Sequence, residues 1–371
     1  LWTQNVSQRD ARVYTRGLYD NTDSSLHSLG SFAARVGLTR SHSQTGVLAV
    51  ANRRYVACHG RGEFTVLDAL TGEVLWRRRG VERGSRLIGD ARILCVVPDR
   101  PSESGAYTLN ALDGSDVDVP NLSELLRSTV AITNSGFIQT GRRTQGRQAS
   151  RSRRMQISAF DPLRGETNWS HEFDSSTSVT FIDDAHLFVL DEKSGACSVL
   201  DLETGSLLPV GEAPAERISR SSERYAVADG RQVYLVLNDA RSSFGVYIHP
   251  PALRTNGTIL AFARDGTGRS WQQTVENQNL LLPGFEQSPL LVFLAYDHVH
   301  LPEIEEAYAK SRLIVLNKSD GRVEADDVRA SPNGNYYRID VDPRQRTVDI
   351  HSHNERVRIE AAVPEKPDEE S

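Results

Sequence analysis

The sequence predicts an all-β fold built from repeated antiparallel sheets, and two observations support this prediction. First, residues 159–169 align without a gap to residues 66–76 and keep the Asp, Leu, Gly, Glu and Trp of that stretch. A repeat of a few tens of residues indicates one supersecondary unit stacked on the next. Second, short apolar runs alternate with Asp-Gly and Asn-Gly-type turns. Such turns are the strongest local signal for β-hairpins.

The turn glycine of the repeat recurs at intervals of about 40 to 60 residues, close to one four-stranded propeller blade with its loops. The copies are Gly72, Gly114, Gly165, Gly205, Gly266 or Gly268, and Gly321. An acidic or amide residue precedes most of them by four positions, at Asp68, Asn110, Asp161, Asp201 and Asn317, whereas the fifth copy has Phe262 or Arg264. We therefore predict a β-propeller of seven blades with four-stranded antiparallel sheets, or eight blades if the N-terminal region completes another.

The first 44 residues are polar and precede the repeats. Within them we expect one short amphipathic helix, with Asp23 as N-cap and Gly37 after its last turn. Its apolar residues recur at helical spacing, at Leu26, Leu29, Phe32, Ala33 and Val36. The propeller is expected over 45–360, and 361–371 form an acidic, proline-containing tail of disordered composition.

Within 45–360 the predicted strands follow a four-part cadence. The first unit has strands at 46–50, 55–58, 64–68 and 73–76, and the second at 86–88, 92–97 and 107–110. Later units begin at 129–132, 178–182, 225–228 and near Leu280. The last unit offers only 336–341, 347–350 and 356–360, so we expect the region of Val13 and Tyr14 to supply its fourth strand, which would close the ring and remove exposed edges.

Composition excludes several classes of protein. A net charge of −6 argues against a general nucleic-acid binder. Three scattered cysteines are too few for a disulfide framework or a zinc knuckle. No run approaches the ~18 to 20 apolar residues that span a bilayer. The chain begins with Leu1, so we expect a fragment or processed form, with membrane attachment through upstream sequence left open.

The repeated pattern Ala/Val-x-Asp-x-x-Thr-Gly-x-x-x-Trp resembles the tryptophan-docking repeat of pyrroloquinoline-quinone-type β-propellers, over roughly 45–360. The resemblance implies that the small residue, the turn glycine and the tryptophan lock each blade to its neighbour. The tryptophan is present as Trp76, Trp169 and, slightly out of register, Trp271, and it is replaced by Asp118, Pro209 and Ala325. The structural repeat residues are then Asp68, Gly72, Trp76, Asp161, Gly165, Trp169, Asp201, Gly205, Trp271 and Gly321.

The same resemblance bears on function. Dehydrogenases of this kind use two adjacent cysteines against the quinone and Glu, Asn and Asp around calcium, and this chain has no Cys-Cys pair. It therefore looks more similar to the non-catalytic members, such as the propeller lipoprotein of outer-membrane β-barrel assembly. The resemblance implies a monomeric scaffold that binds a protein partner in the cell envelope or periplasm. It implies no nucleic-acid partner and no cofactor, so bound PQQ with calcium is not expected. The alternative is a quinone- or metal-dependent oxidoreductase with its site in the central funnel.

Three long insertions, at 141–154, 240–257 and 297–311, are expected between the second and third strands of their blades. Such connections emerge on one face of a propeller, and loops on a rigid scaffold commonly bind partners. Surface insertions are also tolerated without any function. The first insertion has a cluster of arginines without acidic sequence neighbours, which either clamps carboxylate or phosphate groups or forms a solvated hairpin tip: Arg142, Arg143, Arg147, Arg151, Arg153 and Arg154. In the third, Pro302 followed by three glutamates predicts a short helix.

Two His-x-His pairs are weak metal-ligand candidates. Asp349, His351 and His353 would share one face of a strand, and His298 and His300 form the other pair. The apolar Val348 and Ile350 on the opposite face are equally typical of an edge strand with one solvated side.

Overall fold

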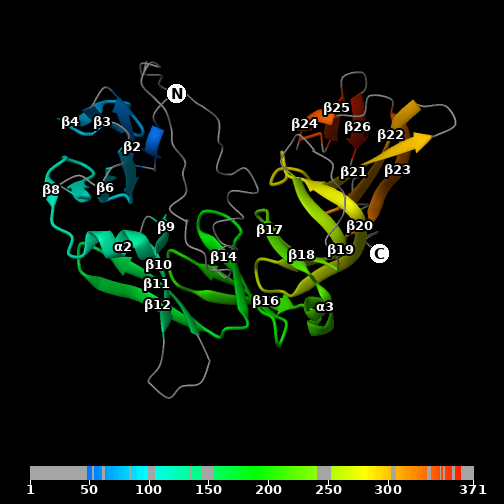
Figure 1. Cartoon of the computed structure of the whole chain (residues 1–371), viewed down its shortest axis with the longest axis horizontal. Coiled ribbons are helices and arrows are strands. Elements are labelled where there is room, and N and C mark those ends of the chain that lie inside the picture. Colours follow the sequence, from blue (N-terminus) through cyan, green and yellow to red (C-terminus); the bar gives the residue numbers. More distant parts are fainter. Residues whose placement is uncertain are drawn as a thin grey trace, which may run out of the picture.

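The computed structural model, drawn in Figure 1, describes most of the chain after residue 47. The described ranges are 48–51, 54–60, 63–82, 85–98, 105–133, 136–143, 154–239, 252–301, 306–331, 336–342, 344–345, 347–352 and 356–360. The predicted helix around Leu26 to Val36, the strand at Val13 and Tyr14, and the tail lie outside these residues. Within them the secondary structure is almost entirely β, which confirms the predicted all-β class.

The first four sheets each contain four antiparallel strands in chain order. The first comprises β1 (Leu48–Ala51), β2 (Tyr55–Gly60), β3 (Glu63–Asp68) and β4 (Val74–Arg79), and the second β5 (Arg86–Gly89), β6 (Ile93–Val97), β7 (Tyr107–Asn110) and β8 (Asp116–Val117). The third comprises β9 (Thr129–Thr133), β10 (Gly136–Arg143), β11 (Arg154–Asp161) and β12 (Glu166–Phe173), and the fourth β13 (Thr177–Phe181), β14 (His186–Asp191), β15 (Ala196–Asp201) and β16 (Leu207–Glu212).

The next two repeat units share one seven-stranded sheet. Its strands are β17 (Glu223–Ala228), β18 (Gln232–Asn238), β19 (Ala252–Ala263), β20 (Arg269–Leu281), β21 (Leu290–Leu301), β22 (Glu306–Asn317) and β23 (Val323–Ser331). Strand β20 is the outer strand of one unit, and its end pairs with β21 of the next, Asn279 with Leu294 and Leu280 with Phe293. The left-handed φ of 52° at Asn277 marks the bend between these two parts.

The last sheet has three strands, β24 (Tyr336–Asp342), β25 (Thr347–Ser352) and β26 (Arg356–Glu360). These bounds match the three strands expected from the sequence. Strand β25 lies between β24 and β26, so the edge-strand interpretation of Asp349 and His351 was wrong. The blade count of seven or eight stays a prediction.

The hydrophobic core is divided into clusters that lie between consecutive sheets. Strand β6 shows why: Leu94 and Val96 pack toward the first sheet, whereas Ile93 and Cys95 pack toward the third. Alternate residues of a strand point to opposite faces, so a sheet covered on both sides reads as a continuous apolar run. Burying a Leu or Val side chain contributes about 1.5–3 kcal/mol, so stacking the sheets stabilises each of them.

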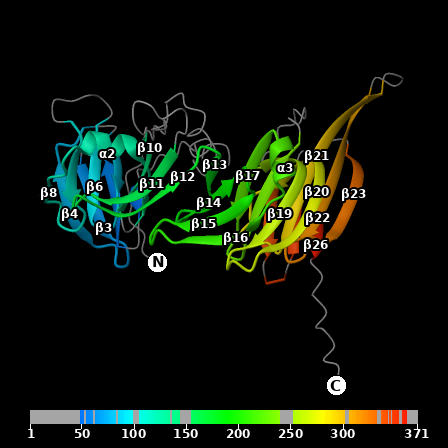
Figure 2. The same cartoon turned by 90° about the horizontal axis from the view of Figure 1, so that it is seen from below.

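Figures 1 and 2 show the sheets following one another along an open arc, with the β1–β4 and β24–β26 sheets at its two ends. Helix α2 (Leu122–Ser128) lies between β8 and β9, and α3 (Ala215–Arg220) between β16 and β17. Neither these nor any other helix in the described ranges has the length and apolar character to cross a bilayer.

Because neighbouring strands are antiparallel, the connections alternate between two sides of the sheets. We call the loop face the side with the second-to-third-strand connections and the links between sheets, including α2 and α3. The turn face is the opposite side, with the first-to-second and third-to-fourth-strand turns. In Figure 2, α2, α3 and the far end of the β21–β22 hairpin lie on the same side.

Candidate functional site

The repeat tryptophan of one unit packs on the turn glycine of the next unit. A Cβ atom on Gly114 would lie 2.7 Å from the ring of Trp76, and one on Gly321 would lie 2.7 Å from Trp271. The indole of Trp76 donates a hydrogen bond to the carbonyl of Ala111 at 2.9 Å, and that of Trp271 to Lys318 at 2.7 Å. Glycine is therefore required at this turn position for two reasons: the backbone has a positive φ, and the indole approaches too closely for a Cβ atom.

The third copy of this contact is altered. Trp169 lies against Gly205, but its indole nitrogen has no hydrogen-bond partner in the described structure. Instead, His171 Nε2 donates to the carbonyl of Gly205 at 2.6 Å. The histidine two residues along β12 therefore supplies a hydrogen bond to the same turn.

Where the tryptophan is replaced, the following glycine has no indole ring against it. Asp118 stands at the tryptophan position of the second unit, and a Cβ atom on Gly165 would meet nothing within 4 Å. Pro209 stands there in the fourth unit, and its carbonyl and Leu208 lie against Gly266. Loss of the tryptophan therefore leaves Gly165 open, whereas other atoms cover Gly266.

The repeat aspartates cap their own turns. Asp68 Oδ1 accepts hydrogen bonds from the backbone N–H groups of Leu70 and Thr71, each at 2.8 Å. These bonds lower the pKa of Asp68. Asp161 and Asp201 accept the corresponding pairs of bonds in their turns. These carboxylates shape backbone, which is the ordinary role of aspartate in turns.

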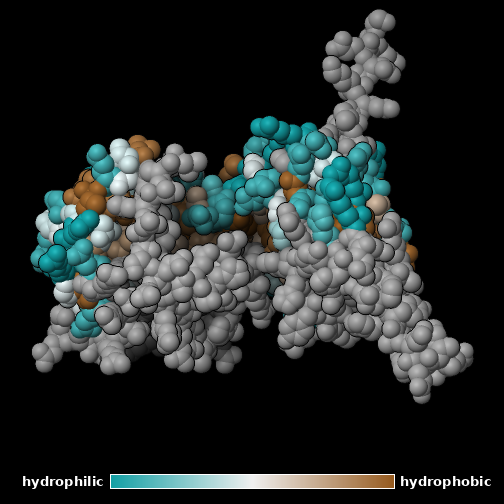
Figure 3. Space-filling model, turned by 90° about the horizontal axis from the view of Figure 1, so that it is seen from above, coloured by the Kyte–Doolittle hydropathy of each residue, from teal (hydrophilic) through white to brown (hydrophobic). Residues whose placement is uncertain are grey.

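Exposed leucines occupy the same turns in the first three units. Leu70, Leu112 and Leu163 each stand two residues after the repeat aspartate or asparagine, and Leu70 is 85% exposed. In Figure 3 the end of the molecule formed by the first sheets displays more apolar residues than the other end. The turn hydrogen bonds hold the backbone here, so these leucines are surface features of the turn face.

Ion pairs connect neighbouring units on the turn face. Each joins the first-to-second-strand turn of one unit to the third-to-fourth-strand turn of the next. Arg92 contacts Asp161 at 2.8 Å, Arg264 contacts Asp183 at 2.8 Å, and Lys318 contacts Asp229 at 2.8 Å. Burial of Asp161 would raise its pKa, but hydrogen bonds from Arg92 and the backbone outweigh burial and lower it.

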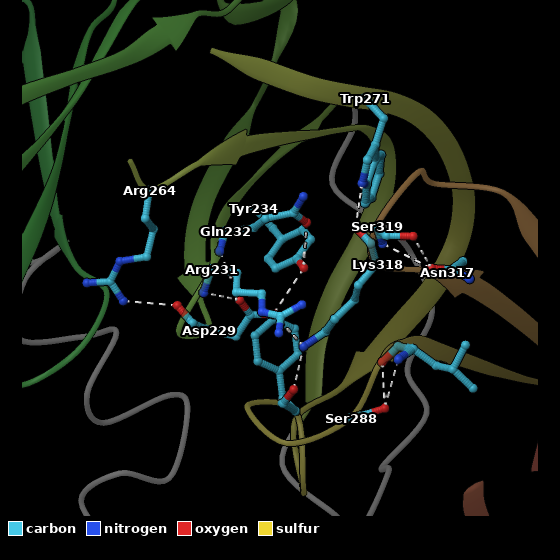
Figure 4. A network of polar contacts seen from close by, with 12 residues as sticks. Asp229, Arg231, Gln232, Tyr234, Arg264, Trp271, Ser288, Asn317, Lys318 and Ser319 are labelled. Carbon is cyan, nitrogen blue, oxygen red and sulfur yellow. Dashed lines mark hydrogen bonds and ion pairs between the residues drawn. The ribbon is translucent and has the colours of Figure 1, made fainter. Parts of the chain in front are cut away.

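Lys318 is the most buried of these cations, and Figure 4 shows its surroundings. Its ammonium group donates to Asp229 Oδ2 and to the carbonyl of Phe285, and it lies 4.0 Å from the Phe285 ring centroid. The Tyr234 hydroxyl lies 3.1 Å from Asp229 Oδ2. Burial lowers the pKa of Lys318, whereas the Asp229 charge opposes that shift.

Sequence reasoning missed this cluster, although one signal was present. Lys318 follows the repeat asparagine directly, at a position that is apolar in the other Asp/Asn copies: Ala69, Ala111, Pro162 and Leu202. A lysine at a repeatedly apolar position indicates a buried charge with a partner. The partner, Asp229, is 89 residues away in sequence. We interpret the cluster as a structural lock between the fifth and sixth units.

The three insertions join β10 to β11, β18 to β19 and β21 to β22, which are second-to-third-strand connections on the loop face. Arg142 and Arg143 end β10, whereas Arg147, Arg151 and Arg153 lie outside the described residues. Arg154 begins β11, and its guanidinium lies 3.5 Å from Glu172 and 3.7 Å from Asp174. The sequence cluster is thus divided, because strand pairing gives its last arginine acidic neighbours.

The third insertion differs from the expected helix. Strands β21 and β22 pair without interruption up to Leu301 and Glu306, so at least Glu306 belongs to a strand. Residues 302–305 lie outside the described structure.

The metal candidates within the described residues belong to two different sheets. His298 and His300 lie on β21 and His351 on β25, whereas His353 is outside the described residues. Asp349 accepts hydrogen bonds from Arg358 and Arg356, which hold its pKa well below the usual range. His351 Nε2 lies 3.2 Å from Asp340 Oδ2 instead.

The chemistry of the donor groups does not fit a quinone–calcium site of the kind the resembled dehydrogenases use. Cys58, Cys95 and Cys197 are buried in separate sheets, so they cannot form an adjacent pair. Burial raises the pKa of Cys95 and Cys197 to about 12, which disfavours their thiolates. In the described part of the chain, no three His, Cys, Asp or Glu side chains gather as metal ligands.

Comparison with known families now identifies the repeats. The family model described as outer membrane protein assembly factor BamB, a PQQ-type repeat family, matches residues 1–119 and 123–280. The chain belongs to this family. It is a protein of PQQ-like repeats with β-propeller architecture, as the sequence predicted.

Solved structures are similar to the chain at low identity. Saccharomyces cerevisiae Sqt1 is 11% identical, with 80% of this chain and 78% of that chain covered and a TM-score of 0.28. The complex of KlAtg21 with the coiled-coil of AgAtg16 is 11% identical, with 74% and 81% covered and a TM-score of 0.31. Dihydro-heme d1 dehydrogenase NirN is 11% identical, with a TM-score of 0.26, and the match covers 75% of this chain and 64% of NirN. A comparison with curated proteins found no match.

Proposed function

We propose that this chain is a non-catalytic scaffold that binds a protein partner in the cell envelope. Membership of the BamB family supports both the scaffold role and the envelope location. The turn face supports a structural role for the charged residues there, because each of the inter-unit cations described above is already paired with a carboxylate.

One observation carries the proposal: all three long insertions belong to the loop face. They arise from the third, fifth and sixth units, each from strands held in a continuous ladder. A rigid sheet that presents variable loops on one side is the common arrangement of binding surfaces in repeat proteins.

The charge of the first insertion indicates the chemistry of the partner. Residues 142–153 contain five arginines and no acidic residue. Guanidinium groups bind carboxylates in a bidentate manner, so an acidic partner surface is complementary. Arg154 is not counted here, because Glu172 and Asp174 already neutralise it.

Site-specific photo-crosslinking tests the face that binds. A benzoyl-phenylalanine at Glu124 of α2 or Arg220 of α3 probes the loop face, and one at Thr71 or Glu203 probes the turn face; all four positions are exposed. We expect a discrete protein adduct in envelope fractions from the loop-face positions only. Adducts confined to the turn face would overturn the proposal, as would dye reduction by the protein loaded with pyrroloquinoline quinone and calcium.

An arginine variant with a matched control sharpens this test. Changing Arg142, Arg143, Arg147, Arg151 and Arg153 to Ser should reduce the loop-face adduct at least tenfold, equivalent to about 1.4 kcal/mol of binding free energy. The control removes exposed arginines from the turn face and should leave the adduct unchanged: Arg164, Arg231 and Arg322.

A further inference from the structure

The β21–β22 hairpin extends beyond the sheet that carries it. The two strands pair along their whole length, from Leu290–Asn317 to Leu301–Glu306. On its other edge, β21 pairs with β20 only at Phe293 and Leu294. Figure 2 shows the hairpin rising past the neighbouring strands. Among the described residues, the edge of β21 from 295 to 301 therefore has no strand partner.

The hydrogen-bond pattern identifies which backbone groups this edge presents. The carbonyl of Leu294 accepts a hydrogen bond from the Asn279 side chain at 3.2 Å, so it faces β20 and not β22. In an antiparallel ladder, successive residues direct their N–H and C=O groups to alternate sides. The main-chain groups of Tyr296, His298 and His300 therefore point to the open edge.

Three other sheet edges in the described structure carry features that hinder pairing. Strand β4 ends in Arg77, Arg78 and Arg79, β16 contains Pro209, and β8 has only two residues. Charges, proline and short length are the usual means of blocking an edge. The 295–301 stretch has one formal charge, Asp297, and no proline. It is a regular edge without these blocks.

We propose that the 295–301 edge of β21 binds an extended segment of the protein partner by strand addition. This inference rests on the proposed scaffold function and deepens it. The alternating N–H and C=O groups of a strand edge are matched by another extended main chain. An acidic segment of another protein fits better than a second copy of this chain, because a second copy would bring a second arginine-rich 142–153 insertion to the same face.

Residue-resolved amide hydrogen exchange on the full chain tests the edge directly. In the free protein the amides of Tyr296, His298 and His300 should exchange at least about tenfold faster than those of Asp297 and Val299, which point to β22. Slow exchange of all five at every concentration would mean that another segment of this chain covers the edge, and protection lost on dilution would mean a second copy does. Either result overturns the proposal.

A proline variant with a side-chain control completes the test. His298→Pro removes the edge donor, whereas His298→Ala keeps it. Benzoyl-phenylalanine is placed at Tyr296, and the same envelope fraction is the probe. The Tyr296 adduct should persist in His298→Ala and fall at least tenfold in His298→Pro. In a parallel experiment, the adduct from benzoyl-phenylalanine at Glu124 shows that both variants are folded. Two results would refute strand addition without refuting the scaffold function. One is a Tyr296 adduct that survives in His298→Pro, and the other is an adduct at Glu124 with none at Tyr296. Loss of the adducts at both positions in the wild type refutes the scaffold function itself.

Discussion

Two turn glycines with nearly the same backbone angle provide a controlled test of tryptophan docking. Gly114 has φ 71° and Gly165 has φ 69°, so an alanine at either position is forced into the left-handed region. That conformation costs roughly 1–2 kcal/mol for a residue with a Cβ atom. At Gly165 the new Cβ meets nothing within 4 Å, whereas at Gly114 it lies 2.7 Å from the Trp76 ring.

We therefore expect Gly165→Ala to lower the free energy of unfolding by about 1 kcal/mol. Gly114→Ala should lower it by about 2–4 kcal/mol, because forcing atoms into a packed contact adds roughly 1–3 kcal/mol. Equilibrium urea unfolding followed by circular dichroism gives both values, provided that the slopes agree with the wild type.

Repeating the glycine substitution in a protein that lacks the Trp76 ring isolates the contribution of the contact between Trp76 and residue 114. In Trp76→Ala protein, the further change Gly114→Ala should cost only about 1 kcal/mol, as at Gly165, since the contact no longer exists. If the two glycine variants are equally destabilised, or if removing the ring gives no relief, then the tryptophan does not dock on the next turn and the explanation of the repeat is wrong.

Three further predictions concern buried groups. Lys318→Met should lower the free energy of unfolding by about 3 kcal/mol, because it leaves Asp229 buried without its cation. In a double-mutant cycle with Asp229→Asn, the double variant should lose at least about 1 kcal/mol less than the sum of the two single variants. Burial opposes ionisation of Asp229, but the Lys318 charge and hydrogen bonds lower its pKa. Its stabilising contribution is therefore present above the unfolded pKa of about 3.9 and is lost as the pH falls through the lower folded value, so Asp229→Asn should flatten melting temperature against pH below about pH 4. The Cys95 thiol, whose pKa burial raises to about 12, should react with Ellman's reagent at pH 8 only after unfolding; immediate reaction in the native protein would show that this sheet is open.

Strand positions were predictable because they depend on neighbours in sequence. Alternating burial and turn chemistry act over a few residues, so the predicted strands at 336–341, 347–350 and 356–360 coincide closely with β24, β25 and β26. The same local pattern identified the turn role of Asp68, whose carboxylate caps its own turn.

The errors and omissions involve contacts across strands. The acidic stretch after Pro302 has a helical pattern, yet Glu306 pairs with Leu301 in a hairpin. Arg154 is surrounded by other arginines in sequence and by Glu172 and Asp174 in space. In each case the deciding partner lies on another strand, and local propensity contains no information about it.

The sequence by itself determined the repeated architecture, the connections that carry the long insertions and the loss of the docking tryptophan in half of the copies. These properties are periodic, and a period can be read from one chain. Only the tertiary structure decided what the units do to each other: that Trp76 covers Gly114 while Gly165 is open, that Lys318 meets Asp229, and that β21 leaves one edge unpaired among the described residues. The physical reason is that stacking order, twist and register set which side chains meet between sheets, and these arise only when whole units pack together.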